Sequence, residues 1–262
     1  MILFPKAKIN LGLNVISKRE DGFHNIESIF YPISLHDVLE VIPSDTAGID
    51  ISITGIIPDG EPSENLVVKG YKEVAKKFTI PGVKVHLHKN IPMGAGLGGG
   101  SSDAAEMVKM LNLLFNLSMS TGDMKTIVSN LGSDCAFFIE GLPSLATGKG
   151  ELLERNDLDL SSYHIGIVYP NVHVNTREAY SGIIPASPVG PLQDIVKQNI
   201  SFWKEYLIND FELTVFSKYP QISEAKTYLY DSGALYASMS GSGSCCYGIF
   251  KDKIQAESIF WV

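Results

Sequence analysis

A short glycine-rich run is the part of the sequence whose composition most clearly suits chemistry. Five glycines occupy positions 94, 96, 98, 99 and 100, and two serines follow them. Glycines let backbone N–H groups converge on one anion, and the run opens into a helical pattern whose free N–H groups also favour negative charge. A flexible turn is the weaker interpretation, because consecutive glycines cost backbone entropy. We therefore predict phosphate contacts from Pro92, Gly94, Ala95, Gly96, Leu97, Gly98, Gly99, Gly100, Ser101 and Ser102.

The spacing of the glycines can be compared with two known phosphate-binding patterns. A Walker A loop ends in Gly-Lys followed by Ser or Thr, whereas Ser101 follows Gly100 here. Residues 94–99 fit the pattern Gly-x-Gly-x-x-Gly, but a dinucleotide fold also needs an acidic residue at a strand end about 20 residues later. The stretch 112–123 instead reads as helix or loop. A dinucleotide-dependent oxidoreductase is therefore disfavoured.

Lys8 and Asp134 could supply a cation and a proton acceptor. Residues 7–15 alternate apolar and polar side chains, which predicts a half-buried strand with Lys8 and Asn10 on its polar face. Asp134 lies in a predicted loop between a helix end and an apolar run. From spacing alone, Lys8 is a solvated lysine and Asp134 is a turn or N-cap residue.

The remaining pattern supplies the elements that must position these residues. Strands are predicted at 7–15, 26–33, 37–42, 49–54, 83–87, 165–169, 235–239 and 245–250, and helices at 65–78, 102–115, 121–131 and 222–232. Residues 181–191 are rich in Pro, Ser and Gly and predict an exposed loop. We expect two domains, 1–155 and 156–262.

Composition excludes several classes of protein. The 262 residues carry a net charge of -8, which argues against a nucleic-acid binder, and their three cysteines do not predict a disulfide framework or a zinc site. No apolar stretch suits a membrane span, and the N-terminus lacks the pattern of a signal peptide. We expect a cytoplasmic protein that binds neither nucleic acid nor membrane.

Three motifs together resemble a known superfamily. Residues 92–105 read Pro-x-x-x-Gly-Leu-Gly-Gly-Gly-Ser-Ser-Asp-Ala-Ala, which resembles the central motif of the GHMP kinases, such as galactokinase, homoserine kinase and mevalonate kinase. Residues 7–13 are similar to the N-terminal strand motif of the superfamily, and residues 239–244 to its C-terminal glycine loop.

The superfamily resemblance implies a fold and cofactors. It implies an α/β (α+β) chain of two domains. The N-terminal domain would contain a mixed sheet and the phosphate loop, and the C-terminal domain would be ferredoxin-like. The active site would lie in the cleft between them. It also implies ATP accompanied by Mg²⁺, and it makes Asn65 a nucleotide contact.

Two further segments narrow the resemblance to one branch of the superfamily. Residues 19–28 and 131–138 are similar to signatures of kinases whose substrate carries a cytidine diphosphate group, in the non-mevalonate route to isoprenoid precursors. The resemblance implies that Asp134 is the general base and that Lys8 lies in the active site. It also implies substrate contacts, with Phe23 stacking on the cytosine, from Asn10, Phe23, His24, Thr176 and Tyr180.

Alternative interpretations stay open at this point. By itself, Phe23 would be a core residue and His24 a surface histidine. Another GHMP kinase, acting on mevalonate, homoserine or a sugar, would have no reason to carry the segment Asp21–His24. A non-catalytic nucleotide-binding protein of this fold would not need Lys8 and Asp134.

Overall fold

The computed structural model describes residues 1–57 and 60–262, and their contacts form two compact units. We call them the first unit, comprising Met1–Ala7, Ser34–Met93 and Gly98–Gly141, and the second unit, comprising Lys8–Ile33, Gly94–Leu97 and Leu142–Val262. The glycine-rich run is thus shared between both units. The predicted domain boundary after residue 155 stays a prediction, since these contacts group the chain in a different way.

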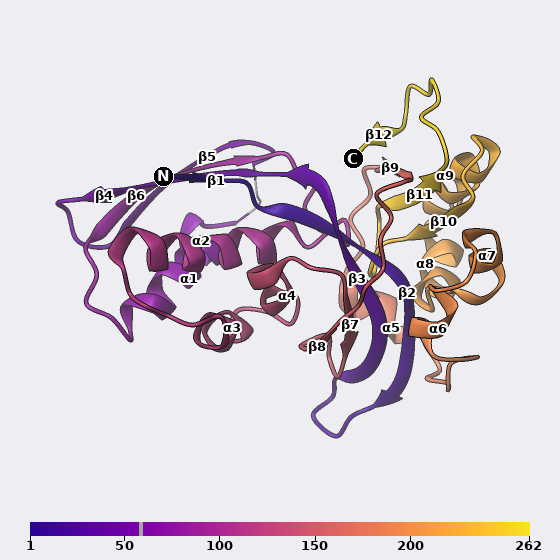
Figure 1. Ribbon diagram of the computed structural model, residues 1–262, viewed down its shortest axis with the longest axis horizontal. Coiled ribbons are helices and arrows are strands. Elements are labelled where there is room, and N and C mark those ends of the chain that lie inside the picture. Colours follow the sequence, from indigo (N-terminus) through magenta and orange to yellow (C-terminus); the bar gives the residue numbers. More distant parts are fainter. Residues whose placement is uncertain (58–59) are drawn as a thin grey trace. The chain divides into compact units, whose positions relative to one another are not determined.

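The first unit is built on a four-stranded sheet with helices packed on it. Its strands, in sheet order, are β1 (Ile2–Leu3), β4 (Val38–Ser44), β6 (Gly82–Lys89) and β5 (Ile49–Gly55). Its helices are η1 (Pro62–Glu64), α1 (Leu66–Ala75), α2 (Gly99–Phe115), α3 (Thr121–Ser129) and α4 (Cys135–Glu140). β6 runs antiparallel to β4 and parallel to β5, which confirms the predicted mixed sheet. Figure 1 shows α1 and α2 lying along this sheet.

Helix α2 begins earlier than its sequence pattern predicted. The pattern placed the start at Ser102, whereas the helix begins at Gly99, with Gly98 as its N-cap. Gly98 adopts a left-handed φ of 71°, a conformation that glycine reaches without steric cost. The last glycines of the run are therefore the first turn of the helix and direct their backbone N–H groups along its axis.

The second unit contains two four-stranded sheets. One has the order β2 (Lys6–Lys18), β3 (His24–His36), β7 (Ser144–Thr147), β8 (Leu152–Arg155). The other has the order β10 (Tyr236–Met239), β11 (Cys246–Phe250), β9 (His164–Val168), β12 (Phe260–Trp261). The helices of this unit are α5 (Thr176–Ser181), α6 (Leu192–Ile195), η2 (Ile200–Phe202), α7 (Trp203–Tyr206), α8 (Phe211–Lys218) and α9 (Pro220–Asp231).

The C-terminal sheet has the connectivity of a split βαβ unit. β11 pairs antiparallel with both β10 and β9, so β9 and β10 run in the same direction on either side of it. The chain between β9 and β10 includes the helices α8 and α9, as a ferredoxin-like arrangement requires. The loop predicted at 181–191 begins one residue later, because Ser181 is the last residue of α5.

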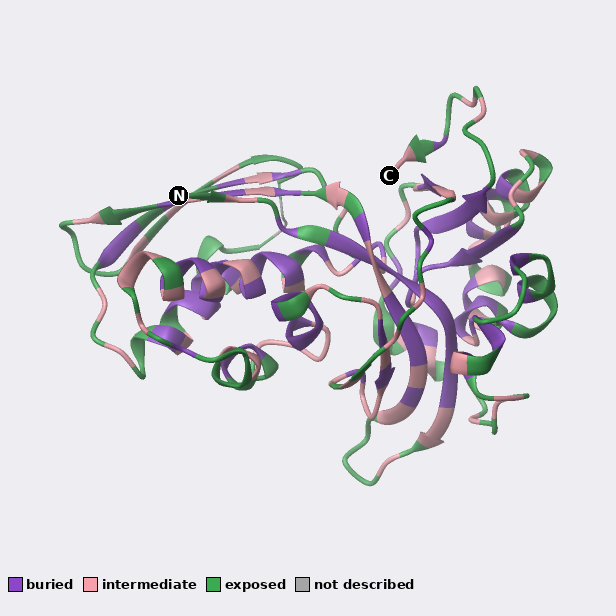
Figure 2. Cartoon of the chain, viewed as in Figure 1, coloured by how far each residue is buried: buried purple, intermediate pink, exposed green. Residues whose placement is uncertain are grey.

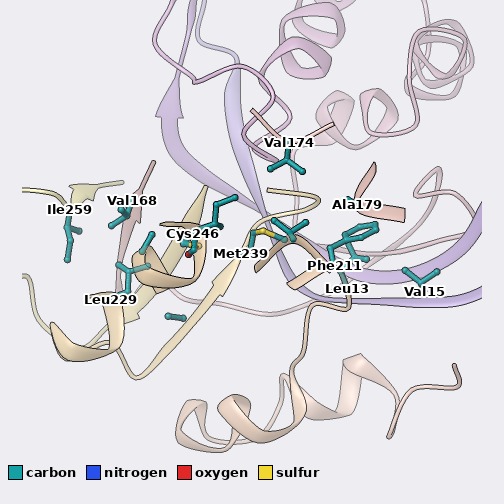
Figure 3. Close-up of a cluster of buried hydrophobic side chains, with 14 of the residues drawn as sticks. Leu13, Val15, Val168, Val174, Ala179, Phe211, Leu229, Met239, Cys246 and Ile259 are labelled. Carbon is teal, nitrogen blue, oxygen red and sulfur yellow. The ribbon is translucent and has the colours of Figure 1, made fainter. Parts of the chain in front are cut away.

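A hydrophobic core joins the N-terminal strand to the C-terminal sheet within the second unit. Figure 3 shows Leu13 and Val15 of β2 in the same buried cluster as Phe211 and Met239. Both segments are needed to complete this core, which explains why residues so far apart in the sequence belong to one unit.

Strand β2 corrects one expectation from the sequence. The alternating pattern predicted that its polar side would face solvent, but Lys8 and Asn10 are only 3% and 2% exposed. Figure 2 shows β2 buried along most of its length. The polar side is covered by other parts of the chain, so Lys8 is not a solvated lysine. Among the residues described, no helix is long and apolar enough to cross a membrane.

Candidate active site

The second half of the glycine-rich run belongs to the first unit and forms the start of α2. Ser102 N–H donates to the Gly98 carbonyl at 2.9 Å, which closes the first turn. Gly100 is exposed and Ser101 is half-buried, whereas Ser102 is buried. Exposed backbone N–H groups at a helix N-terminus form a site suited to a phosphate.

The first half of the run belongs to the second unit and is fixed by neighbouring backbone. Gly94 and Gly96 have positive φ angles of 61° and 76°, and the side chains of Ala95 and Leu97 between and after them are buried. Lys8 N–H donates to the Leu97 carbonyl at 2.9 Å, and Cys245 N–H donates to the Ala95 carbonyl at 3.1 Å. The N-terminal strand and the C-terminal glycine turn therefore both hold the run in place.

Gly96 makes the closest approach in this half of the run. A Cβ atom at Gly96 would lie 1.8 Å from the Ser240 carbonyl oxygen, so no other residue fits. The Ser240 hydroxyl donates to the Gly96 carbonyl at 2.8 Å. The Asn10 N–H donates to the same hydroxyl at 3.3 Å. The three motifs singled out in the sequence therefore meet within the second unit.

Lys8 lies in a buried polar network. Its ammonium donates to the Asn10 side-chain oxygen at 2.5 Å and lies 4.8 Å from the centroid of the Phe30 ring. The Asn10 amide donates in turn to the Ser28 hydroxyl at 2.9 Å. A buried ammonium in such a network has a defined position, which a solvated lysine lacks.

Asp134 occupies the N-cap position of α4 without acting as a cap. Its side chain accepts no capping hydrogen bond, although the residue is half-buried. The apolar run that follows it is α4 itself, which the sequence pattern did not predict. A cap would direct the carboxylate into the helix end, so the geometry does not support the N-cap interpretation.

Packing around Cys135 links the start of α4 to the start of α2. A Cβ atom at Gly132 would lie 3.4 Å from Cys135 Sγ and 3.8 Å from Ser101 Oγ. Burial raises the pKa of the Cys135 thiol to about 11, and the Ser101 hydroxyl opposes this shift. Asp134 therefore directly precedes a residue that packs at the first turn of α2, within the first unit.

Two aromatic residues occupy the tip of the β2–β3 hairpin. Phe23 is 57% exposed, so it is not the core residue that its type alone would suggest. Asp21 accepts the Phe23 N–H at 3.1 Å and pairs with Arg19 at 3.0 Å, which orders the turn. The His24 ring stacks on Tyr180 with centroids 4.6 Å apart, and burial lowers the pKa of His24.

Two remaining predicted contacts lie at helix starts. Thr176 begins α5, and its hydroxyl lies 3.2 Å from the Ser242 hydroxyl of the C-terminal glycine turn. Asn65 caps α1, because its side-chain oxygen accepts the Val67 N–H at 2.9 Å. A Cβ atom at Gly100 would lie 3.5 Å from Leu66, so the starts of α1 and α2 are neighbours.

Comparisons with known proteins decide the family. Residues 65–141 match the GHMP kinase N-terminal domain, and residues 192–260 match the GHMP kinase C-terminal domain. A 4-diphosphocytidyl-2-C-methyl-D-erythritol kinase of Parabacteroides distasonis is 49% identical over 99% of this chain and 96% of its own. The enzyme of the same name from Cytophaga hutchinsonii is 50% identical over 97% and 93%.

The chain belongs to the 4-diphosphocytidyl-2-C-methyl-D-erythritol kinase family. A crystal structure of a 4-(cytidine 5'-diphospho)-2C-methyl-D-erythritol kinase matches it with a TM-score of 0.82 and 31% identity, covering 95% of this chain and 90% of that one. A mevalonate kinase of Methanococcus jannaschii matches with a TM-score of 0.68 and 12% identity over 95% and 90%, which shows the fold alone. The predicted kinase family and GHMP fold are thus confirmed.

The structure also brings together residues of this kinase that the sequence analysis did not single out. The Lys149 ammonium lies 4.8 Å from the centroid of the Phe23 ring. The Asn209 side-chain amide donates to the carbonyls of Met239 and Gly241 at 2.8 and 2.9 Å and fixes the C-terminal glycine turn. No pattern in the sequence marks these contacts, because each joins segments that are far apart along the chain.

Proposed function

We propose that the chain transfers the γ-phosphoryl group of ATP to the 2-hydroxyl of 4-diphosphocytidyl-2-C-methyl-D-erythritol. The hairpin tip carries this proposal, because an exposed phenylalanine ring beside a stacked histidine suits a pyrimidine base. Similarity to kinases of this name over almost the whole chain supports the same substrate. Mevalonate and homoserine kinases share the fold at identities of 12% and 18% and carry no weight for their own substrates.

The proposed reaction is a direct displacement at phosphorus. The 2-oxygen of the substrate forms a bond to the γ-phosphorus, while the bond from that phosphorus to the bridging oxygen of ADP breaks. The hydroxyl proton passes to the Asp134 carboxylate. The products are ADP and a phosphate monoester, with the diphosphate of the substrate intact. Phosphoryl transfer depends mainly on positioning and charge stabilisation, so an oriented oxygen and a nearby base suffice.

Lys8 contributes positive charge in this proposal. Its ammonium is buried, and burial strengthens its interaction with the developing charge on the attacking oxygen. The 2-carbon of the substrate bears a methyl group, so its hydroxyl is tertiary and hindered. Asn10, which accepts a hydrogen bond from Lys8, would help orient that hydroxyl.

The nucleotide would enter as its magnesium complex and be held by the glycine-rich run. Positive φ angles at Gly94, Gly96 and Gly98 free backbone N–H groups for the phosphates. Among the described residues, no three His, Cys, Asp or Glu side chains cluster as a metal site. A magnesium ion bound by the phosphates would neutralise part of their charge. Asn65 remains the proposed contact for the base of the nucleotide.

Recognition of the cytidine group would rest on the aromatic residues of the hairpin. Phe23 offers a ring face, and His24, whose pKa is lowered by burial, offers a neutral imidazole edge for hydrogen bonding. Tyr180 would complete the aromatic pair, and Thr176 would contact the substrate from the start of α5. Lys149, over the Phe23 ring, adds a cation at this end of the site.

A coupled ADP-release assay with MgATP tests the proposal. The assay compares 4-diphosphocytidyl-2-C-methyl-D-erythritol with mevalonate, homoserine and galactose at equal concentration. Turnover only with the cytidine compound would support the proposal. Turnover with another alcohol would show that the chain is a kinase but that Phe23 and His24 do not have the proposed roles in substrate recognition. ATP binding without turnover on any of them would leave a non-catalytic nucleotide-binding protein.

A further inference from the structure

A buried group of three charged residues lies beneath the first turn of α2. Lys89, at the end of β6, forms ion pairs with Asp37 and with Asp103, the latter at 2.7 Å. Their side chains are 3% exposed or less. Removing charges from water is costly, so each of these groups depends on its partners for compensation.

Asp37 anchors the lysine to the backbone. One oxygen of its carboxylate accepts the N–H groups of Asn90 and Ile91 at 2.6 and 2.8 Å, and the other accepts from Lys89. The carboxylate is therefore fully hydrogen-bonded, and it fixes the chain that leads from β6 into the glycine-rich run.

Asp103 anchors the lysine to α2. Gly99 and Asp103 are four residues apart and share one face of the helix. A Cβ atom at Gly99 would lie 2.8 Å from the Ile91 side chain, which is too close, and 3.3 Å from the Lys89 ammonium, which is tight. The ammonium is thus packed against the first residue of α2, where the helix dipole is also positive.

We propose that Lys89 is a positioning residue for the phosphate loop. Its ammonium, held by Asp37 and Asp103, fixes the first turn of α2 and offsets the negative charge of these two carboxylates beneath the helix end that would receive the nucleotide phosphates. The inference rests on the proposed function, because it requires that this helix start binds ATP. Lys89 itself is buried and touches no phosphate, so it acts through the backbone of the run and through its charge.

Substituting Lys89 and substituting Asp103 should change the affinity for ATP in opposite directions. Lys89→Met removes a positive charge beneath the proposed phosphate site and should weaken ATP binding at least about tenfold. Asp103→Asn removes a negative charge but keeps an oxygen that can accept from Lys89. It should tighten ATP binding at least about twofold. A purely structural role would weaken binding in both variants.

Equilibrium binding of MgATP at pH 8 tests this inference, with the thermal midpoint of each variant measured in parallel. Lys84→Met, an exposed lysine on the same strand, is the matched control and should bind as the wild type does. In the kinase assay, Lys89→Met should raise KM for ATP while KM for the cytidine substrate stays within about twofold.

The outcomes separate this inference from the proposed function. Tighter binding by Asp103→Asn with weaker binding by Lys89→Met would support the role of Lys89. Unchanged or weaker binding by Asp103→Asn would overturn it, and this variant decides the question if Lys89→Met does not fold. Wild-type protein that fails to bind MgATP at all would instead contradict the proposed function.

Discussion

At the scale of single residues, the proposed substrate-binding side chains lie at the surface, whereas the proposed catalytic lysine is buried. Phe23 and His24 lie at a hairpin tip where a ligand can reach them, whereas Lys8 is held in a buried network. Asp134 lies at a helix start without serving as its cap.

We predict that Asp134→Ala lowers kcat at least about 10²-fold and leaves the affinity for ATP within about threefold, as expected for a general base. Steady-state kinetics and ATP binding would measure both quantities. Asp157→Ala, which changes an aspartate whose side chain is 97% exposed, is the control and should match the wild type. A kcat of the Asp134 variant within a few-fold of wild type would remove Asp134 from the mechanism.

We predict that Phe23→Ala raises KM for the cytidine substrate by about tenfold, because stacking of a base on an aromatic ring contributes about 1–3 kcal/mol. KM for ATP should not change. Phe202→Ala removes another exposed phenylalanine ring, 54% exposed, and should leave both constants unchanged. The stacking role would be wrong if the substrate KM of Phe23→Ala equals that of the control.

At the scale of elements, the glycine-rich run is held by parts of the chain far from it in sequence. Its first half is fixed by hydrogen bonds with Lys8, Ser240 and Cys245. Its second half is the first turn of α2. A loop fixed in this way needs little reorganisation when a phosphate binds, which is an advantage for electrostatic catalysis.

Gly96→Ala should disrupt this arrangement. The added Cβ atom would lie 1.8 Å from the Ser240 carbonyl oxygen, and the φ of 76° is unfavourable for alanine. We expect a lower thermal midpoint and at least a tenfold loss of ATP affinity. Gly122→Ala is the matched control, since its Cβ atom would meet only Ser120 Oγ at 3.7 Å in a helix. Equal ATP affinity in the two variants would contradict the proposed phosphate role of the run.

Local patterns predicted most elements, because alternation and helical spacing reflect the neighbours of a residue along the chain. They predicted the strands 83–87 and 245–250 and the helix 222–232, which the structure contains with small shifts at their ends. They failed for the burial of β2, because burial of its polar face depends on chain segments that fold over it. The short helix α4 was missed because six residues are too few to show a period.

Only the site residues that belong to sequence motifs could be predicted. The glycine-rich run and the hairpin signature mark their own residues, so their members could be named in advance. Asn209 and Lys89 act through a few contacts with residues at least 14 positions away, such as the Lys89 pair with Asp103. Such contacts leave no periodic trace in a single sequence and need the structure to be seen.

At the scale of the whole molecule, the buried charges should link stability to pH. Burial raises the pKa of Asp103 to about 7, with Asp37 raising it and Lys89 opposing. A carboxyl whose folded pKa exceeds its unfolded value near 3.9 stabilises the protein fully at low pH and loses this contribution as pH rises through the folded pKa. The stability of the wild type relative to Asp103→Asn should therefore fall between about pH 4 and pH 7.

Urea unfolding midpoints of both proteins at pH 5, 6, 7 and 8 would measure this difference. Lys89 and Asp37, which face the Asp103 carboxyl, are present in both proteins, so the two chains differ only at residue 103. A difference between the two proteins that stays constant across this range would show that Asp103 does not titrate there.

The proposed transfer to the 2-hydroxyl can be tested most directly on its product. Phosphorus NMR of the reaction of MgATP with 4-diphosphocytidyl-2-C-methyl-D-erythritol reports each phosphate separately. We predict ADP, one new phosphate monoester with no proton on its attached carbon, and an unchanged diphosphate, since the 2-carbon bears no hydrogen. A monoester coupled to a carbon-bound proton, or free phosphate in place of an ester, would contradict the account.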